Sequence, residues 1–78
     1  MVIGFVLMHV SPLREYEVFN KLLKLHEVIE LHPLFGEYDL IAKIQAEDYE
    51  SIGEIIIQKI KTISGIIDTT TLTGIKLH

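Results

Sequence analysis

The chain opens with an almost unbroken apolar run and then changes to a helical spacing of apolar residues. Residues 2–10 carry valine, isoleucine, leucine, methionine and phenylalanine at both odd and even positions. Successive side chains of a strand point to opposite faces, so this run predicts a β-strand that is covered on both faces. The two faces are expected to carry Ile3, Phe5 and Leu7 on one side and Val2, Val6 and Met8 on the other.

The helical spacing begins directly after this strand. Ser11 is expected to be the N-cap of an amphipathic helix of about three turns, with Pro12 as its first residue. Charged residues occupy the opposite side of this helix. The apolar stripe expected to face the sheet consists of Leu13, Tyr16, Phe19, Leu22 and Leu23.

Two further strands are predicted in the middle of the chain. Residues 27–34 mix apolar and polar positions. Pro33 near their end indicates an edge strand or a bulge, because proline cannot donate a hydrogen bond to a neighbouring strand. Residues 38–46 form the next strand, and the connection 35–37 has the length of a hairpin turn.

The remaining residues predict a second helix and a final strand. Asp48 is positioned to cap a helix over residues 49–63, and Gly65 can take the left-handed conformation that often ends one. Residues 66–77 then form the fourth strand. Ile57 lies off the apolar stripe of this helix, which consists of Ile52, Ile55, Ile56, Ile60 and Ile63.

The order strand, helix, strand, strand, helix, strand predicts an α+β fold of the ferredoxin-like βαββαβ type. In this fold a four-stranded antiparallel sheet carries both helices on one face. Because the first strand is apolar on its other face too, we expect that open face to meet a second subunit and form a dimeric α+β barrel. Residues 1–78 are expected to make a single domain.

Composition supports self-association and excludes several classes of function. The chain has 78 residues, of which 49% are hydrophobic, more than a lone two-layer domain of this size needs. The net charge is −4 and the seven basic residues are scattered, so no direct binding to nucleic acid is expected. No apolar run reaches the ~18 residues of a membrane span, and the apolar start lacks a basic leader. We therefore expect a cytoplasmic protein with no membrane contact.

The sequence offers no pattern for a metal, a cofactor or a catalytic centre. It contains no cysteine, and its four histidines show no ligand spacing. His32 is close in sequence to the turn that follows it and could line a pocket there, although a surface position is the simpler interpretation. No nucleophile and base occur at a convincing spacing, so we expect no enzymatic activity.

The first candidate binding site for a small ligand is the turn formed by Gly36, Glu37, Tyr38 and Asp39. Gly36 permits a positive φ and a close approach of the backbone. Asp39 can accept a hydrogen bond from the ammonium of a ligand, or hold the backbone of the turn itself. Tyr38 can stack on a ligand or pack in an interface, and Glu37 is expected to face solvent.

A run of threonines in the last strand is the second candidate contribution to a binding site. At least one of its hydroxyls should point to the same side as Asp39 if the strands pair as expected. The β-branched side chains would also suit a strand with no binding role. The three residues are Thr69, Thr70 and Thr71.

These features together resemble the effector-binding domain, or RAM domain, of the Lrp/AsnC family of transcriptional regulators. The residues that carry the resemblance are the Gly36-x-Tyr38-Asp39 turn between the second and third strands, the helix cap Asp48, and Gly65 before the threonine-rich strand. The resemblance covers essentially the whole chain. No helix-turn-helix precedes the first strand, so the chain looks like a stand-alone RAM protein.

The resemblance implies a regulatory function. RAM domains dimerise through their sheets, and the dimers often form rings, commonly octamers made as tetramers of dimers. Amino acids bind between dimers near the Gly-x-Tyr-Asp turn. By this resemblance the protein would bind a small amino-acid effector and act through a full-length Lrp/AsnC regulator or another partner. The expected ligand-binding residues are Gly36, Glu37, Tyr38, Asp39, Thr69, Thr70 and Thr71.

Two alternatives share this topology. A small dimeric α+β barrel enzyme, similar to a monooxygenase or an isomerase, would need polar side chains facing the cavity between sheet and helices, where this sequence has almost only aliphatic ones. An ACT-like amino-acid sensor is expected to have a glycine at the first junction of strand and helix. Here that junction is Val10-Ser11-Pro12.

Overall fold

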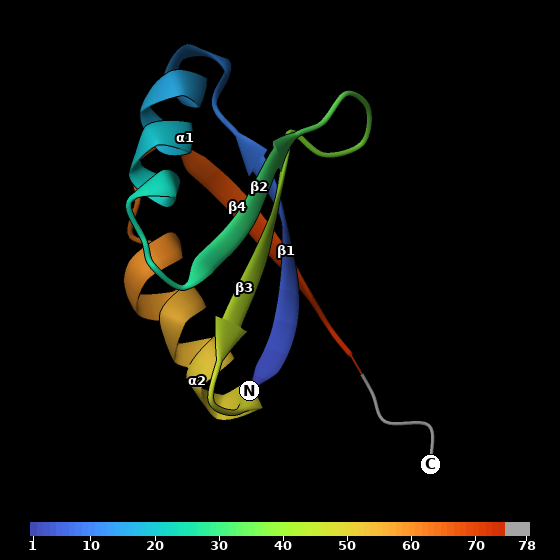
Figure 1. Cartoon of the computed structure of the whole chain (residues 1–78). Helices are drawn as coiled ribbons and strands as arrows, with labels where there is room; N and C mark the ends of the chain where they lie inside the picture. The colour runs from blue at the N-terminus through green and yellow to red at the C-terminus, as the bar shows by residue number, and fades with distance from the viewer. Residues whose placement is uncertain (75–78) are drawn as a thin grey trace.

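The computed structural model describes residues 1–74, which form one antiparallel sheet with two helices on one face (Figure 1). Two short helical segments, η1 and η2, directly adjoin the two α-helices. The elements are β1 (Val2–Val10), η1 (Pro12–Arg14), α1 (Glu15–Leu23), β2 (Val28–Pro33), β3 (Leu40–Ala46), α2 (Tyr49–Ile55), η2 (Ile56–Ile60) and β4 (Ile66–Thr73).

The strand order β2-β3-β1-β4 confirms the ferredoxin-like topology predicted from the sequence. β1 lies inside the sheet and pairs with both β3 and β4, so that Val6 lies opposite Ala42 on one side and Thr71 on the other. β2 lies at an edge, which confirms the prediction made from Pro33. A register shift between Val28 and Glu30 adds a bulge to the same strand.

The core fills the space between the helices and one face of the sheet. Alternate residues of β1 and β3 are buried there, and so are the side chains of both helices that face them. Gly4 allows α2 to approach closely, because a Cβ at this position would lie 3.0 Å from Ile52 Cγ2. The fully buried side chains include Val6, Met8, Val18, Leu22, Ile44, Ile52 and Ile60.

The second helix confirms its predicted cap and buried face. Asp48 Oδ1 accepts a hydrogen bond from the backbone N–H of Ser51 at 2.7 Å, and this bond lowers the pKa of the Asp48 carboxyl. The helix continues beyond α2 as a π-helical turn, η2, rather than as a regular α-helix to Ile63. Ile52, Ile55, Ile56 and Ile60 are buried, Ile63 packs against them, and Ile57 is exposed, as predicted.

The first helix differs from its prediction. It begins with the 3₁₀ turn η1, and the Ser11 side chain makes no capping hydrogen bond. Leu13, Tyr16 and Leu23 of the predicted stripe are exposed, at 95%, 87% and 55%. Val18, which we did not assign to the stripe, is fully buried with Leu22. Tyr16 is exposed because the start of α1 borders an open cleft, described below, instead of the sheet.

The strand boundaries also differ from the prediction in the hairpin. β3 begins at Leu40 rather than at Tyr38, so the connection is a six-residue loop over residues 34–39. The second strand agrees to within one residue at each end. β4 ends at Thr73, and the predicted continuation over residues 75–77 lies outside the described residues.

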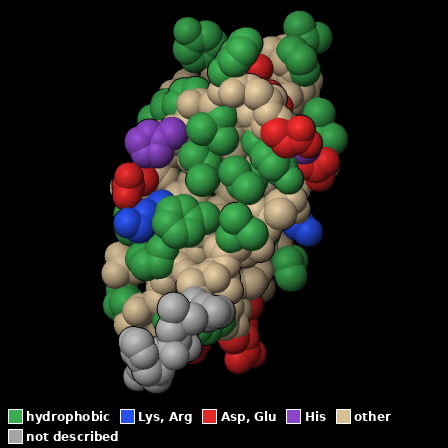
Figure 2. Space-filling model, turned by 90° about the vertical axis from the view of Figure 1, so that its right-hand side faces the viewer, with side chains coloured by type: hydrophobic (Ala, Val, Ile, Leu, Met, Phe, Trp, Pro, Cys, Tyr) green, Lys and Arg blue, Asp and Glu red, His purple; other side chains and the backbone are tan. Residues whose placement is uncertain are grey.

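The face of the sheet away from the helices is apolar and only partly covered. Figure 2 shows hydrophobic side chains gathered across the middle of this face, with charged and histidine side chains nearer its margins. The strand pairing places Phe5 beside Leu72 and Leu7 beside Ile41 on this side. Within residues 1–74, therefore, helices cover one face of β1 and leave the other open. No helix in the described part of the chain is long and apolar enough to cross a membrane.

A glycine at the end of the second helix provides a test of this packing. Gly65 has φ +107°, and a Cβ there would lie 2.8 Å from Arg14 Cβ and 2.9 Å from Val18 Cγ2. We expect Gly65→Ala to lower the free energy of unfolding by about 2–4 kcal/mol through backbone strain and overpacking. Gly53→Ala, where a Cβ meets nothing within 4 Å, should instead raise it by about 0.5–1 kcal/mol. Urea unfolding of both variants measures this, and equal effects would contradict the packing described.

Candidate functional site

The loop over residues 34–39 closes the β2–β3 hairpin and extends away from the sheet, at the upper right of Figure 1. Gly36 has φ +132°, a conformation that favours glycine, and a Cβ there would meet nothing within 4 Å. The glycine therefore shapes the turn but does not itself pack against another element. The loop is held instead by its two ends and by the contacts of Glu37, Tyr38 and Asp39.

Asp39 fastens the base of the loop. Its backbone N–H donates to Met8 O at 2.9 Å, and its carbonyl accepts from Leu34 N at 2.8 Å. Its side-chain Oδ2 accepts from Val10 N at 2.7 Å. Of the two roles considered for Asp39, the contacts show the structural one, although the backbone group that its carboxylate holds belongs to β1 and not to the turn.

His9, at the end of β1, connects the loop to β4. Its Nδ1 lies 2.6 Å from Asp68 Oδ1, and its Nε2 lies 2.7 Å from the carbonyl oxygen of Glu37. Both partners are acceptors, so both ring nitrogens donate when the imidazole is protonated. The Asp68 carboxylate, and after it the Glu37 carbonyl, raise the pKa of His9 above its ordinary value of 6.5.

Tyr38 completes this cluster. Its ring stacks on His9 with the centroids 4.6 Å apart and the planes inclined by 20°. Its hydroxyl donates to Thr70 Oγ1 at 3.4 Å, a long hydrogen bond. The Tyr38 hydroxyl therefore contacts β4, and the Tyr38 ring covers one side of the His9 imidazole.

The structure brings together only part of the predicted binding set. Thr70 pairs with Leu7 and so lies on the open face beside Tyr38. Thr69 and Thr71 pair with Met8 and Val6, which places them on the opposite side of β4 from the loop contact. Glu37 contributes its backbone oxygen, and it is exposed as expected.

Two residues of this cluster, His9 and Asp68, were not identified from the sequence. The only available signal was that His9 occupies an odd position of the first strand, on the same face as Leu7. Its pairing with Asp68 depends on the register of β1 with β4, which the apolar pattern does not specify. His32, which was considered as a pocket residue, instead contacts Glu30 Oε1 at 3.3 Å on the exposed surface of β2.

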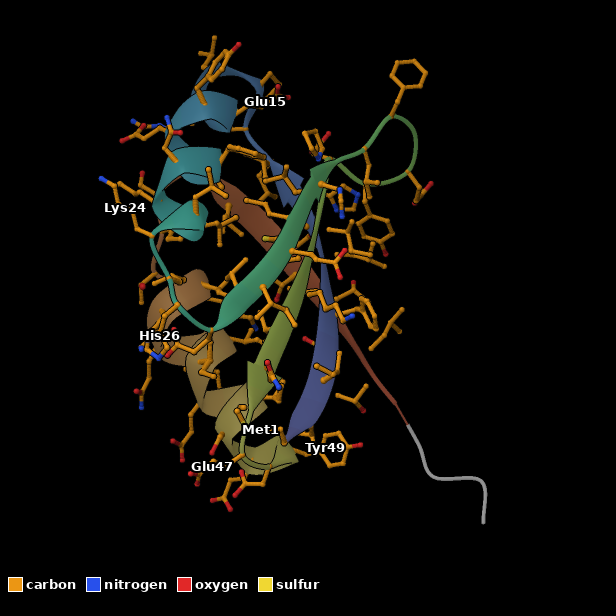
Figure 3. All side chains as sticks on the ribbon, in the orientation of Figure 1. Met1, Glu15, Lys24, His26, Glu47 and Tyr49 are labelled. Atoms are coloured by element: carbon orange, nitrogen blue, oxygen red, sulfur yellow. The ribbon has the colours of Figure 1, made fainter. Side chains whose placement is uncertain are left out.

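A cleft of about 340 Å³ opens between α1 and the loop. Its volume is at the small end of the range for ligand pockets. Glu15, at the start of α1, and Asp39 are its acidic residues, and Figure 3 shows Glu15 at the end of the helix nearest the loop. Among the described residues no group of three potential metal ligands occurs. The cleft is lined by Glu15, Tyr16, Phe19, Pro33, Leu34, Asp39 and Leu40.

The family model for the Lrp/AsnC ligand binding domain matches residues 3–76 of this chain. The chain belongs to the Lrp/AsnC family. An uncharacterized HTH-type transcriptional regulator of Pyrococcus furiosus, PF0250, is 35% identical over 74 residues, covering 91% of this chain and 49% of the relative. The HTH-type transcriptional regulator FL11 of the same organism is 29% identical over 77 residues, or 99% of this chain and 50% of FL11. The chain thus spans about half the length of the curated Lrp/AsnC relatives that it matches.

Solved structures of this family share the fold. The crystal structure of FFRP-DM1 is 37% identical with a TM-score of 0.90, covering 96% of this chain and 100% of that one. Escherichia coli AsnC is 28% identical with a TM-score of 0.87, covering 96% of this chain and 51% of AsnC. A regulator from Neisseria meningitidis solved with L-Met has the same fold at 15% identity and a TM-score of 0.84, covering 97% of this chain and 51% of its own.

Substitution of Asp39 tests its role in holding the loop. Asp39→Ala leaves the N–H of Val10 without its acceptor, and we expect the free energy of unfolding to fall by about 1–3 kcal/mol. Asp39→Asn keeps an acceptor oxygen and should cost clearly less. Denaturant unfolding of the two variants measures the difference, and an Ala variant as stable as the wild type would show that this bond does not contribute.

Proposed function

We propose that this Lrp/AsnC domain is a regulatory module that binds a small amino acid in the cleft between α1 and the loop. The observation that carries the proposal is the composition of the cleft, which places two acidic residues beside an apolar wall. An amino acid presents an ammonium group and a side chain, and these match the carboxylates and the wall respectively. The relatives are named transcriptional regulators, and we propose that this domain likewise binds its ligand without transforming it.

The charges of the cleft suggest how the ligand would lie. Its ammonium would approach Glu15 and Asp39, while an apolar side chain would contact Tyr16 and Phe19. The described residues that line the cleft include no basic side chain to meet the ligand's carboxylate. A residue from a second subunit would supply that interaction.

An apolar L-amino acid is the effector class that fits these features. The regulator from Neisseria meningitidis, with the same fold, is in complex with L-Met, which is an amino acid of this class. For this chain, we choose an apolar amino acid because the wall of the cleft is aromatic and aliphatic. Gly36, Glu37, Tyr38 and Thr70 would act by shaping the loop and its neighbouring surface, and Thr69 and Thr71 have no assigned contact with the ligand.

Assembly is the second part of the proposal. The open face carries Phe5, Leu7, Ile41 and Leu72 in a mostly apolar surface. Two copies packed through these faces would cover that surface, because aligned sheets bury their inner faces against each other. We propose this homodimer as the basic unit, and a tetramer of dimers as the assembly in which neighbouring dimers complete the clefts. A full-length Lrp/AsnC regulator is the proposed partner for transcriptional control.

Ligand binding is tested by adding L-Met, L-Leu and L-Phe, at up to millimolar concentration, and measuring the melting temperature and isothermal titration heats. Binding to the folded state should raise the melting temperature. Glu15→Gln should weaken binding roughly tenfold, since it removes the charge opposite the ammonium. Glu17→Gln, on the same helix but outside the cleft, is the matched control. If none of these amino acids produces heat or a thermal shift, the proposed effector class is wrong.

The proposed dimer face is tested with a charge on the open face. Leu72→Glu alters a side chain that is 53% exposed in one chain, so we expect a smaller assembly with its fold retained. Ile57→Glu places the same charge at a side chain that is 64% exposed on the helix side and should leave assembly unchanged. Light scattering after size exclusion measures the mass of both. An unchanged mass for Leu72→Glu would contradict the proposed interface.

A further inference from the structure

His9 lies where three parts of the chain meet. It belongs to β1, it contacts Asp68 of β4, and it contacts both the Glu37 carbonyl and the Tyr38 ring of the loop. Most of the loop's other fastenings join its base to β1 or close the hairpin on itself. His9 thus joins both β1 and β4 to the middle of the loop, and the long Tyr38–Thr70 hydrogen bond is a second link to β4.

The two ring contacts require a proton on each nitrogen. Asp68 Oδ1 and Glu37 O are both acceptors, at 2.6 and 2.7 Å from the ring. A neutral imidazole has one N–H and one lone pair, so it can donate to only one of them. The lone pair on the unprotonated ring nitrogen would then face the other oxygen, and no hydrogen bond could form there. The stronger, charge-assisted bond to the Asp68 carboxylate is the one that a single N–H would keep, and the bond to Glu37 would be lost.

We propose that His9 is a positioning residue whose protonated ring holds the β2–β3 loop in the conformation that borders the cleft. Deprotonation releases Glu37, and with it the middle of the loop, so that the hydrogen bonds of Leu34 and Asp39 at its base open more often. This inference concerns the loop by itself and can be tested without any effector. Its consequence for effector affinity rests on the function proposed above.

The charges around His9 favour the protonated ring from each side. Asp68 faces it from β4 with a carboxylate in direct contact. Asp39, which precedes β3, adds a second negative charge whose field also raises the pKa of His9. Tyr38 is the titratable side chain of the loop that stacks on the ring.

The direction of the pH effect follows from the raised pKa of His9. A group with a higher pKa when folded stabilises the folded form fully at pH values below its ordinary pKa of 6.5. This contribution is lost as the pH rises through the raised pKa of the folded protein. Loop order should therefore decrease from slightly acidic to alkaline pH, and not in the opposite direction.

The experiment is a titration of the full chain by NMR without added amino acid. The His9 ring should titrate above 6.5. The amides of Glu37 and Tyr38 should shift with the midpoint of His9. Hydrogen-exchange protection at Leu34 and Asp39, corrected for the intrinsic rate at each pH, should fall roughly tenfold across that midpoint, as for the loss of one hydrogen bond. A His9 midpoint at or below 6.5, or loop protection that does not change with pH, would overturn the proposal.

Three variants separate positioning from simple packing. His9→Phe keeps an aromatic ring for Tyr38 but loses both hydrogen bonds, so its loop should be poorly protected at every pH. Asp68→Asn keeps an oxygen but removes the charge, and it should move the loop transition to lower pH. His26→Gln is the control, because His26 lies in the turn between α1 and β2, well away from the loop (Figure 3). Retention of the wild-type pH profile in His9→Phe would refute the inference.

The variants also separate this inference from the proposed function. If amino acids bind, their affinity should fall in step with loop protection as the pH rises, and His9→Phe should bind weakly at every pH. If amino acids do not bind but the loop transition is present, the positioning role stands and the effector class is wrong. If amino acids bind to His9→Phe with wild-type affinity, binding does not depend on the loop conformation that His9 holds. The proposed effect of His9 on effector affinity is then refuted. Circular dichroism of His9→Phe establishes that it is folded, and the wild-type titration requires no variant.

Discussion

The one-sided coverage of the sheet is the constraint on which the rest of this structure depends. Alternate residues of β1 and β3 lie against both helices and are buried, as Val6 and Ile44 illustrate. The intervening residues form a mostly apolar surface that no helix or strand of residues 1–74 covers (Figure 2). A sheet that is apolar on both faces but covered on one has a strong hydrophobic tendency to associate. This tendency gives the proposed dimer a physical basis that does not depend on resemblance.

The central position of β1 also explains how the polar contacts that hold the loop come together. β1 pairs with both β3 and β4, so its last residues meet the loop before β3 on one side and the start of β4 on the other. His9 and Val10 use these two sides, through Asp68 and Asp39 respectively. The end of β1 and the start of β4, which are far apart in the sequence, thereby fix the shape of the loop between them.

The loop separates two environments with different chemistry. On the helix side it borders a cleft with acidic residues and an apolar wall, and on the open side its Tyr38 stacks on His9 of β1. A ligand in the cleft and a partner on the open face would therefore act on the same six residues. In the proposed function, such a shared element would couple ligand binding to assembly if the ligand had different affinities for the two assembly states.

Local chemistry in the sequence determined the order of the elements, the Asp48 cap, the glycine at position 65 and the isoleucine stripe of the second helix. Each depends on neighbours within a few residues, so periodicity and propensity suffice. Only the tertiary structure decided that Tyr16 borders a cleft instead of packing in the core, and that Thr70 rather than Thr69 meets the loop. It also decided that His9 faces Asp68. These outcomes depend on strand register and on where a helix lies over the sheet, which are set by contacts between distant segments and carry no local signal.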